Sequence, residues 1–187
     1  MQEMFARSFS SDHEFQLQDQ LGVFERRLLG TISDAEIREF IHTRSAAKPL
    51  DMDSCGAHFS IVDFLVEEFP DAKFLLTLRD IYSWMNSVVG KLLGDFTGGW
   101  GSRAGALMNC LDVLPDGRFL LTDQQNTKVR LEQMAKIWSG VNQRVIAAVP
   151  KERLLIVHTE ELMERSVEIA ACCGIDPDLL DPIHANA

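Results

Sequence analysis

The sequence predicts an α/β fold built on a parallel sheet. Two apolar runs, residues 73–78 and 153–157, have the near-continuous hydrophobic character of strands that are covered on both faces. Amphipathic segments with helical spacing surround these runs, and the connections between them are short. Helices that alternate with buried strands in this way are typical of a parallel sheet with helices packed on its faces.

In the N-terminal third, residues 1–13 are polar and are predicted to be loose. Apolar residues recur on one helical face over 14–29, which predicts a helix there. Residues 33–36 match a capping box, which predicts a second helix that ends at about residue 43. Residues 48–53 then lead into a short buried strand.

In the middle of the chain, residues 59–69 predict an amphipathic helix, and Pro70 ends it before the strand 73–78. Asp80 is placed to cap a helix over 81–94. Residues 95–125 contain five glycines and a proline, so we expect an irregular loop that covers the site.

In the C-terminal third, apolar residues at helical spacing predict a long helix over 127–148. The strand 153–157 follows. Thr159 is placed to cap a last helix over 160–173, which Gly174 ends.

The composition restricts the class of protein. The chain has 187 residues, 46% of them hydrophobic and 25% charged, which fits one globular domain over residues 1–187. There is no membrane-spanning apolar run and no signal-peptide pattern, so we expect a cytoplasmic protein. The net charge of −10 argues against nucleic acid or a membrane as a partner. The four cysteines form no CxxC pair, and no metal-ligand spacing occurs.

One group of side chains follows the first predicted strand. Arg79 ends that strand, at the edge of a parallel sheet where ligands bind. Ser83 and Ser87 are four residues apart on the following helix and share one face, and the N-terminus of this helix favours an anion. Arg79 and Ser87 therefore predict a phosphate clamp. The alternative is an arginine paired with a carboxylate beside an exposed serine.

Three segments in register resemble the sulfotransferase family. FPDAKFLLTLRDIYSWMNSV, residues 69–88, is similar to the family pattern in which a strand after a "PDAK" turn ends in Arg and is followed by Ser, with Trp84 matching a bacterial branch. The other two segments are DMDSCGAHFSIVDFLVEEF at 51–69 and VPKERLLIVHTEELMERSVEIAACCGID at 149–176. On these segments the chain is identified as a member of that family.

The resemblance implies a three-layer parallel sheet of the P-loop nucleotide-binding type, incomplete at the N-terminus. It implies that Arg79 and Ser87, with Ser83 beside them, hold the 3′-phosphate of PAPS (3′-phosphoadenosine 5′-phosphosulfate) or of its product PAP. The implied reaction moves a sulfuryl group from PAPS to a hydroxyl or amine of a small molecule or glycan. A homo-oligomer is compatible with these expectations.

The chain departs from the family pattern at its start. Members open with a strand and a turn resembling "G-x-x-K-T/S-G-T-T", which wraps the 5′-phosphosulfate with backbone N–H groups, and residues 1–50 contain no such sequence. The basic tail of the family is also missing after residue 183. We therefore expect a truncated sulfotransferase chain. The alternatives are a non-catalytic relative that binds PAP or a protein partner, and a kinase-like nucleotide enzyme.

His58 is the candidate general base. It precedes Arg79 by about the distance found in the cytosolic branch of the family, although the residues around it do not match that branch. A structural role beside helix 59–69 is the alternative. Asp51 and Asp53, at the end of a predicted strand, and His158, at the end of strand 153–157, are further candidates.

Overall fold

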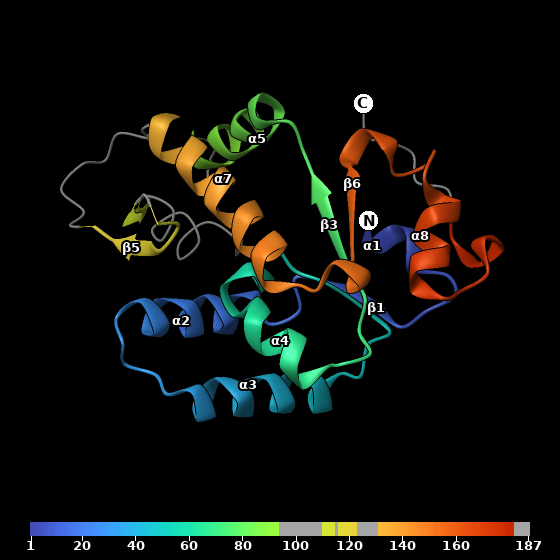
Figure 1. Cartoon of the computed structure of the whole chain (residues 1–187), viewed down its shortest axis with the longest axis horizontal. Coiled ribbons are helices and arrows are strands. Elements are labelled where there is room, and N and C mark those ends of the chain that lie inside the picture. Colours follow the sequence, from blue (N-terminus) through green and yellow to red (C-terminus); the bar gives the residue numbers. More distant parts are fainter. Residues whose placement is uncertain (94–109, 115, 123–130, 182–187) are drawn as a thin grey trace.

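The computed structural model describes residues 1–93, 110–114, 116–122 and 131–181 (Figure 1). The strands are β1 Ser11–His13, β2 Met52–Ser54, β3 Phe74–Leu78, β4 Leu111–Val113, β5 Phe119–Leu121 and β6 Leu154–His158. The α-helices are α1 Gln2–Phe5, α2 Leu17–Leu28, α3 Asp34–Ala47, α4 Val62–Glu68, α5 Ile81–Leu93, α7 Leu131–Ala148 and α8 Ser166–Cys173. Short 3₁₀ turns are η1 His58–Ile61, η2 Lys151–Arg153, η3 Thr159–Glu161 and η4 Pro177–Leu179.

Strands β3 and β6 form the central parallel pair, in a register that runs from Phe74 opposite Leu154 to Leu78 opposite His158. Figure 1 shows them side by side, with α7 on one side and α8 on the other. The face toward α1 and α8 is apolar, and its buried core includes Met4, Phe5, Val157, Ile169 and Ala170. The two strands predicted from the apolar runs 73–78 and 153–157 are confirmed as β3 and β6. Because Leu78 lies opposite His158, the end of β3 that precedes Arg79 lies next to the end of β6.

The general α/β class is confirmed, but a complete three-layer sheet is not seen in the described residues. Strands β1 and β2 form a separate parallel pair, and β4 and β5 form an antiparallel hairpin. Met52 of β2 packs against the same apolar core as Leu75 and Leu155. The two parallel pairs are therefore joined through side chains rather than through a continuous backbone ladder.

The N-terminal segment differs from its prediction. Residues 1–13 were expected to be loose because they are polar, yet they contain α1 and β1. Met4 is 0% exposed and Phe5 is 3% exposed, since both belong to one buried apolar cluster with Val157 and Ile169. Burial of two large apolar side chains against distant residues is enough to order a segment whose local sequence is polar.

Two further predictions need correction. The last helix begins at Ser166 instead of residue 160, and Thr159 lies in a 3₁₀ turn where its hydroxyl donates to the Leu78 carbonyl instead of capping a helix. The predicted cover loop at 95–125 lies mostly outside the described residues. Its described part contains the hairpin β4–β5, which packs on α7.

The capping box is confirmed in full. The Ser33 side chain accepts from the Glu36 N–H, and the Glu36 carboxylate accepts from the Ser33 N–H at 2.9 Å. The Ser33 N–H, Arg26 and the Ser33 hydroxyl all donate to the Glu36 carboxylate and lower its pKa to about 2. All four cysteines are free thiols. Within the described ranges, no helix combines the length and the apolar character needed to cross a membrane.

Candidate functional site

The junction between β3 and α5 carries the predicted phosphate clamp. Asp80 caps α5 as expected, because its Oδ1 accepts from the N–H groups of Tyr82 and Ser83 at 3.0 Å each. The Ser83 hydroxyl and N–H both stabilise the Asp80 carboxylate and hold its pKa below the usual range. Ser83 is thus already used in the helix cap, and it supports the junction through Asp80.

Arg79 and Ser87 are the two predicted residues that this cap leaves available. The Arg79 side chain is exposed, and its charge adds to the Ser83 hydrogen bonds that lower the pKa of the adjacent Asp80. Ser87 lies one turn beyond Ser83 on α5 and is half-buried. An exposed guanidinium at the carboxyl end of a parallel strand is suited to bind a phosphate.

Two hydrogen bonds from other elements hold the backbone at this junction. The Trp138 indole N–H on α7 donates to the Arg79 carbonyl at 3.1 Å. The Thr159 hydroxyl, which follows β6, donates to the Leu78 carbonyl at 2.9 Å. These contacts fix the position from which the Arg79 side chain leaves the strand.

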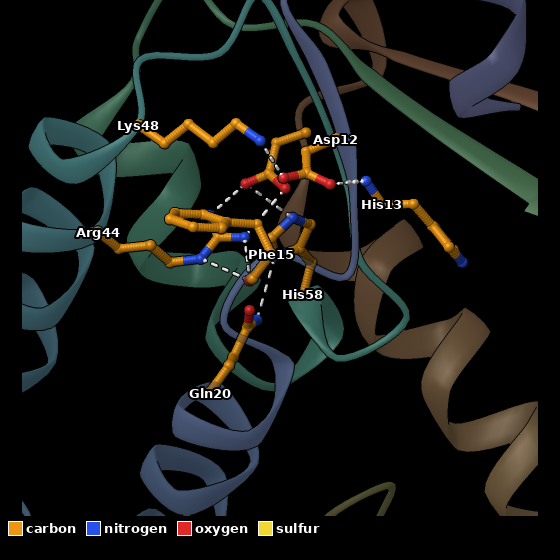
Figure 2. Close-up of polar contacts among 8 residues, drawn as sticks. Asp12, His13, Phe15, Gln20, Arg44, Lys48 and His58 are labelled. Atoms are coloured by element: carbon orange, nitrogen blue, oxygen red, sulfur yellow. Dashed lines mark hydrogen bonds and ion pairs between the residues drawn. The ribbon is translucent and has the colours of Figure 1, made fainter. Parts of the chain in front are cut away.

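His58 and Asp53 belong to a second group, the Asp53 cluster, which we define as Gln20, Arg44, Asp53 and His58. Gln20, Arg44 and His58 of this cluster are labelled in Figure 2. Arg44 forms a two-armed ion pair with Asp53, in which one arm is a 3.0 Å bond from Nη2 to Oδ1. Arg44 also donates to the Phe15 carbonyl at 2.8 Å and 3.2 Å. The cluster joins α2, α3, β2 and η1.

Both ring nitrogens of His58 are occupied. Its Nε2 lies 3.3 Å from the Asp53 Oδ2, and its Nδ1 lies 3.1 Å from the Gln20 Nε2. Since Gln20 donates to Nδ1, the neutral ring carries its proton on Nε2 and gives it to Asp53. In this state His58 is a bridge between two side chains, and neither nitrogen is open to an acceptor group.

The charge of Asp53 is stabilised in the folded chain. Burial would raise its pKa, but hydrogen bonds from His58 and Arg44, together with the Arg44 charge, outweigh burial and hold the pKa well below its usual range. Asp53 is therefore ionised and fully engaged. Asp51 is not part of the Asp53 cluster. Its Oδ2 accepts a hydrogen bond from the Ser10 N–H at 3.0 Å, which connects the residue before β2 to the residue before β1.

His158 lies at the predicted edge of the β3–β6 pair. It is opposite Leu78 in the strand pair, is exposed, and has its Nδ1 4.0 Å from a Glu160 carboxylate oxygen. Trp84 of α5 packs in a core that also includes Ala57 and Cys55, beside His58. The helix that carries Ser87 and the segment that carries His58 thus share one apolar core.

Sequence reasoning missed Gln20, Arg44 and Trp138, and it gave Thr159 a different role, as a helix cap. A usable signal existed for two of them. Gln20 falls on the inner face of α2 between buried leucines, and Arg44 follows Ile37 and Ile41 on the buried face of α3. A polar residue at a buried helical position needs a partner, which marks it for a polar cluster.

Comparison with known proteins gives the class of this chain. The sulfotransferase domain family matches residues 41–164, which is more than half of the sequence. The chain belongs to the sulfotransferase domain family. A search of curated proteins finds no match. The matched range contains the β3–α5 junction, and it also contains Arg44, Asp53 and His58 of the Asp53 cluster.

Proposed function

We propose that this chain binds PAPS or PAP at the β3–α5 junction and takes part in sulfuryl transfer to a hydroxyl or amine. Arg79 and Ser87 hold the 3′-phosphate, and Ser83 supports them through the Asp80 cap. The observation that carries the proposal is the exposed Arg79 guanidinium at the end of β3, whose backbone carbonyl accepts the Trp138 indole N–H. Membership of the family supplies the reaction class.

The reaction that this proposal implies is an in-line displacement. The acceptor oxygen or nitrogen forms a bond to sulfur, the bond from sulfur to the bridging oxygen of PAPS breaks, and PAP leaves with the negative charge. A general base takes the acceptor proton. His58 is our candidate, with Asp53 orienting its ring, and it acts only after Gln20 releases the Nδ1 lone pair.

The second candidate function is binding without catalysis, in which the chain is a non-catalytic relative that binds PAP or a protein partner. The sequence of residues 1–50 favours it, because no "G-x-x-K-T/S-G-T-T" turn for the 5′-phosphosulfate occurs there. A lack of nucleic-acid or membrane partners remains our expectation from the net charge of −10.

The nucleotide site is tested by thermal shift with PAP and with 5′-AMP, which differ at the 3′-phosphate. We expect PAP to stabilise the chain more than 5′-AMP, and Arg79→Ala to abolish this difference. Arg118→Ala is the control, since Arg118 is exposed and pairs only locally with Asp116. Equal shifts for the two nucleotides, or an unchanged PAP shift in Arg79→Ala, would refute the site.

Sulfuryl transfer is tested separately with PAPS labelled on sulfur and a panel of hydroxyl and amine acceptors. Transfer that is lost in Arg79→Ala and reduced in His58→Gln would support the enzyme. No transfer to any acceptor, with PAP binding intact, would favour the non-catalytic function.

A further inference from the structure

We propose that Gln20 is a positioning residue that holds His58 in both protonation states of its ring. The Gln20 amide donates to Nδ1 of the neutral ring, and after a half-turn the same amide accepts a hydrogen bond from Nδ1 of the protonated ring. The inference rests on the proposed role of His58 as the general base. It gives the ring the second acceptor that a base needs once it has taken a proton.

Gln20 is a buried polar side chain on α2. It is 0% exposed, and Leu17 and Phe24, one turn before and one turn after it, are buried on the same helix. Its Nε2 lies 3.1 Å from the His58 Nδ1 (Figure 2). Its Oε1 has no hydrogen-bond partner among the described residues. A buried carbonyl oxygen without a partner destabilises a fold, and a second orientation of the amide that uses this oxygen accounts for it.

The two ends of the Gln20 amide exchange places when the amide turns about its last carbon–carbon bond. The carbonyl oxygen and the NH2 group are nearly indistinguishable in shape, and this torsion is roughly two-fold, so the half-turn requires no shift of α2. Oε1 then takes the position of Nε2, which is 3.1 Å from the His58 Nδ1. A neutral Nδ1 offers a lone pair and matches the NH2 group, whereas a protonated Nδ1 matches the carbonyl oxygen.

Asp53 holds the other side of the ring in both states. The His58 Nε2 lies 3.3 Å from the Asp53 Oδ2, and its N–H donates to that oxygen whether the ring is neutral or protonated. Arg44 keeps the carboxylate in place through the two-armed ion pair. Burial would raise the pKa of Asp53, but hydrogen bonds from His58 and Arg44 hold it well below its usual range. The carboxylate therefore stays ionised and balances the charge that the ring gains.

Glu14 and Arg144 are further charged side chains near the segment of His58. Glu14, which precedes α2, acts electrostatically on the Cys55 thiol. Arg144 on α7 donates to the carbonyl of the residue after His58 at 2.8 Å and is ion-paired with α4. Burial raises the pKa of Cys55 to about 11, so this thiol is neutral. The carboxylate that contacts the ring itself is that of Asp53.

The proposed reaction uses both orientations of the amide. The half-turn frees the Nδ1 lone pair of His58, and the O–H or N–H bond of the acceptor breaks as its proton forms an N–H bond at Nδ1. The electron pair stays on the acceptor atom, which bonds to sulfur, and the ring carries the positive charge. Nε2–H then donates to Asp53 and Nδ1–H donates to Oε1 of Gln20, so both N–H groups of the protonated base have an acceptor.

The test is nitrogen-15 nuclear magnetic resonance of the whole chain, labelled on histidine and measured without nucleotide. The ring signals of His58 are those that are missing from His58→Gln. The pH is lowered until both ring nitrogens carry a proton. We expect Nδ1–H in the wild type to exchange with water at least about tenfold more slowly than in Gln20→Met, because a charge-assisted hydrogen bond protects it. Gln20→Glu keeps an acceptor oxygen and should restore the protection.

Gln143→Met is the matched control. Gln143 is an exposed glutamine on α7 that donates to Ser139, so this variant should leave the His58 signals unchanged. Circular dichroism of each variant confirms that it is folded, and Gln20→Leu replaces Gln20→Met if the methionine variant is not.

Three outcomes would overturn the inference. They are equal exchange of Nδ1–H in the wild type and Gln20→Met, a ring that stays neutral until the chain unfolds, and a wild-type Nδ1–H that exchanges as fast as the ring of the exposed His13. The last two need no variant of Gln20. Because no nucleotide is used, such a result refutes the role of Gln20 alone, and the site at Arg79 is judged by its own thermal-shift test.

Discussion

Arg153 offers the sharpest test of how this fold is held together. Its guanidinium donates to three carbonyls at the C-terminal end of α4 and the turn after it: Val66 at 3.1 Å, Phe69 at 2.5 Å and Ala72 at 3.0 Å. It also lies 5.3 Å from the centroid of the Phe74 ring. One side chain before β6 thus closes the end of α4 and positions the first residue of β3.

The expected cost of Arg153→Ala follows from these contacts. A hydrogen bond from a charged donor contributes about 1.5–3 kcal/mol, and a cation at a helix C-terminus adds about 0.3–1 kcal/mol. The three bonds share one group and water can reach part of the site, so they do not add fully. We expect a loss of about 3–4 kcal/mol in the free energy of unfolding. Arg153→Lys keeps the charge but not the planar fork, and should lose about 2 kcal/mol.

Urea unfolding followed by far-ultraviolet circular dichroism measures both variants, with the slope of the transition as a check that the unfolded state is unchanged. For a chain of this size, each kcal/mol corresponds to about 2–4 °C in Tm. Lys151→Ala is the matched control, since Lys151 is exposed in the same 3₁₀ turn, and it should stay within about 0.5 kcal/mol. If Arg153→Ala also stays within about 1 kcal/mol, the clamp does not stabilise the fold and the reasoning fails.

Three further substitutions test other contacts. Trp138→Phe keeps an aromatic ring but removes the donor to the Arg79 carbonyl, so calorimetry should show PAP binding about three- to tenfold weaker. Asp53→Asn removes a carboxylate whose pKa is lowered in the folded chain. That carboxylate stabilises the fold above its unfolded pKa of about 4, and this stabilisation is lost as the pH falls through the folded pKa. Urea unfolding should therefore show a loss of about 1–3 kcal/mol at neutral pH that shrinks in acid. Gly140→Ala gains about 1 kcal/mol of helix propensity in α7, but its new Cβ would lie 3.0 Å from the Val113 side chain, and overpacking of about 1–3 kcal/mol should make the variant less stable by urea unfolding.

Each of these expectations has an outcome that contradicts it. A Trp138→Phe variant that binds PAP like the wild type would show that the Arg79 backbone needs no tether. A stability loss in Asp53→Asn that is the same at neutral and acid pH would mean that the carboxylate charge is not the source. A more stable Gly140→Ala variant would show that the hairpin β4–β5 can move away from α7.

Much of the secondary structure follows from local signals. The apolar runs of β3 and β6, the capping box at Ser33 and the stop at Gly174 each depend on residues within one or two turns. Local sequence determines these features because backbone hydrogen bonds and caps are satisfied by near neighbours. The prediction that Thr159 caps the last helix was wrong because local signals do not show distant partners. The Thr159 hydroxyl donates to the Leu78 carbonyl on β3, which is far away in the sequence.

The candidate site was predictable in part. Arg79, Asp80 and the serines of α5 follow directly from a strand end and a helix start, and the structure places them at one junction. The environment of His58 was not predictable, because Gln20 and Asp53 reach it from other elements. Spacing along the chain identifies a candidate base, but only its neighbours in space determine whether a nitrogen is free.

By itself, the sequence determined the class of fold, the family resemblance and the residues at the end of β3, because these depend on periodicity and on short motifs. The tertiary structure decided which groups are already paired: Ser83 with Asp80, Arg44 with Asp53, and the Glu14 N–H with the Ser54 carbonyl of β2. The physical reason is that pairing joins segments far apart in sequence, and a charged or polar group can serve a ligand only when folding has left it without another partner.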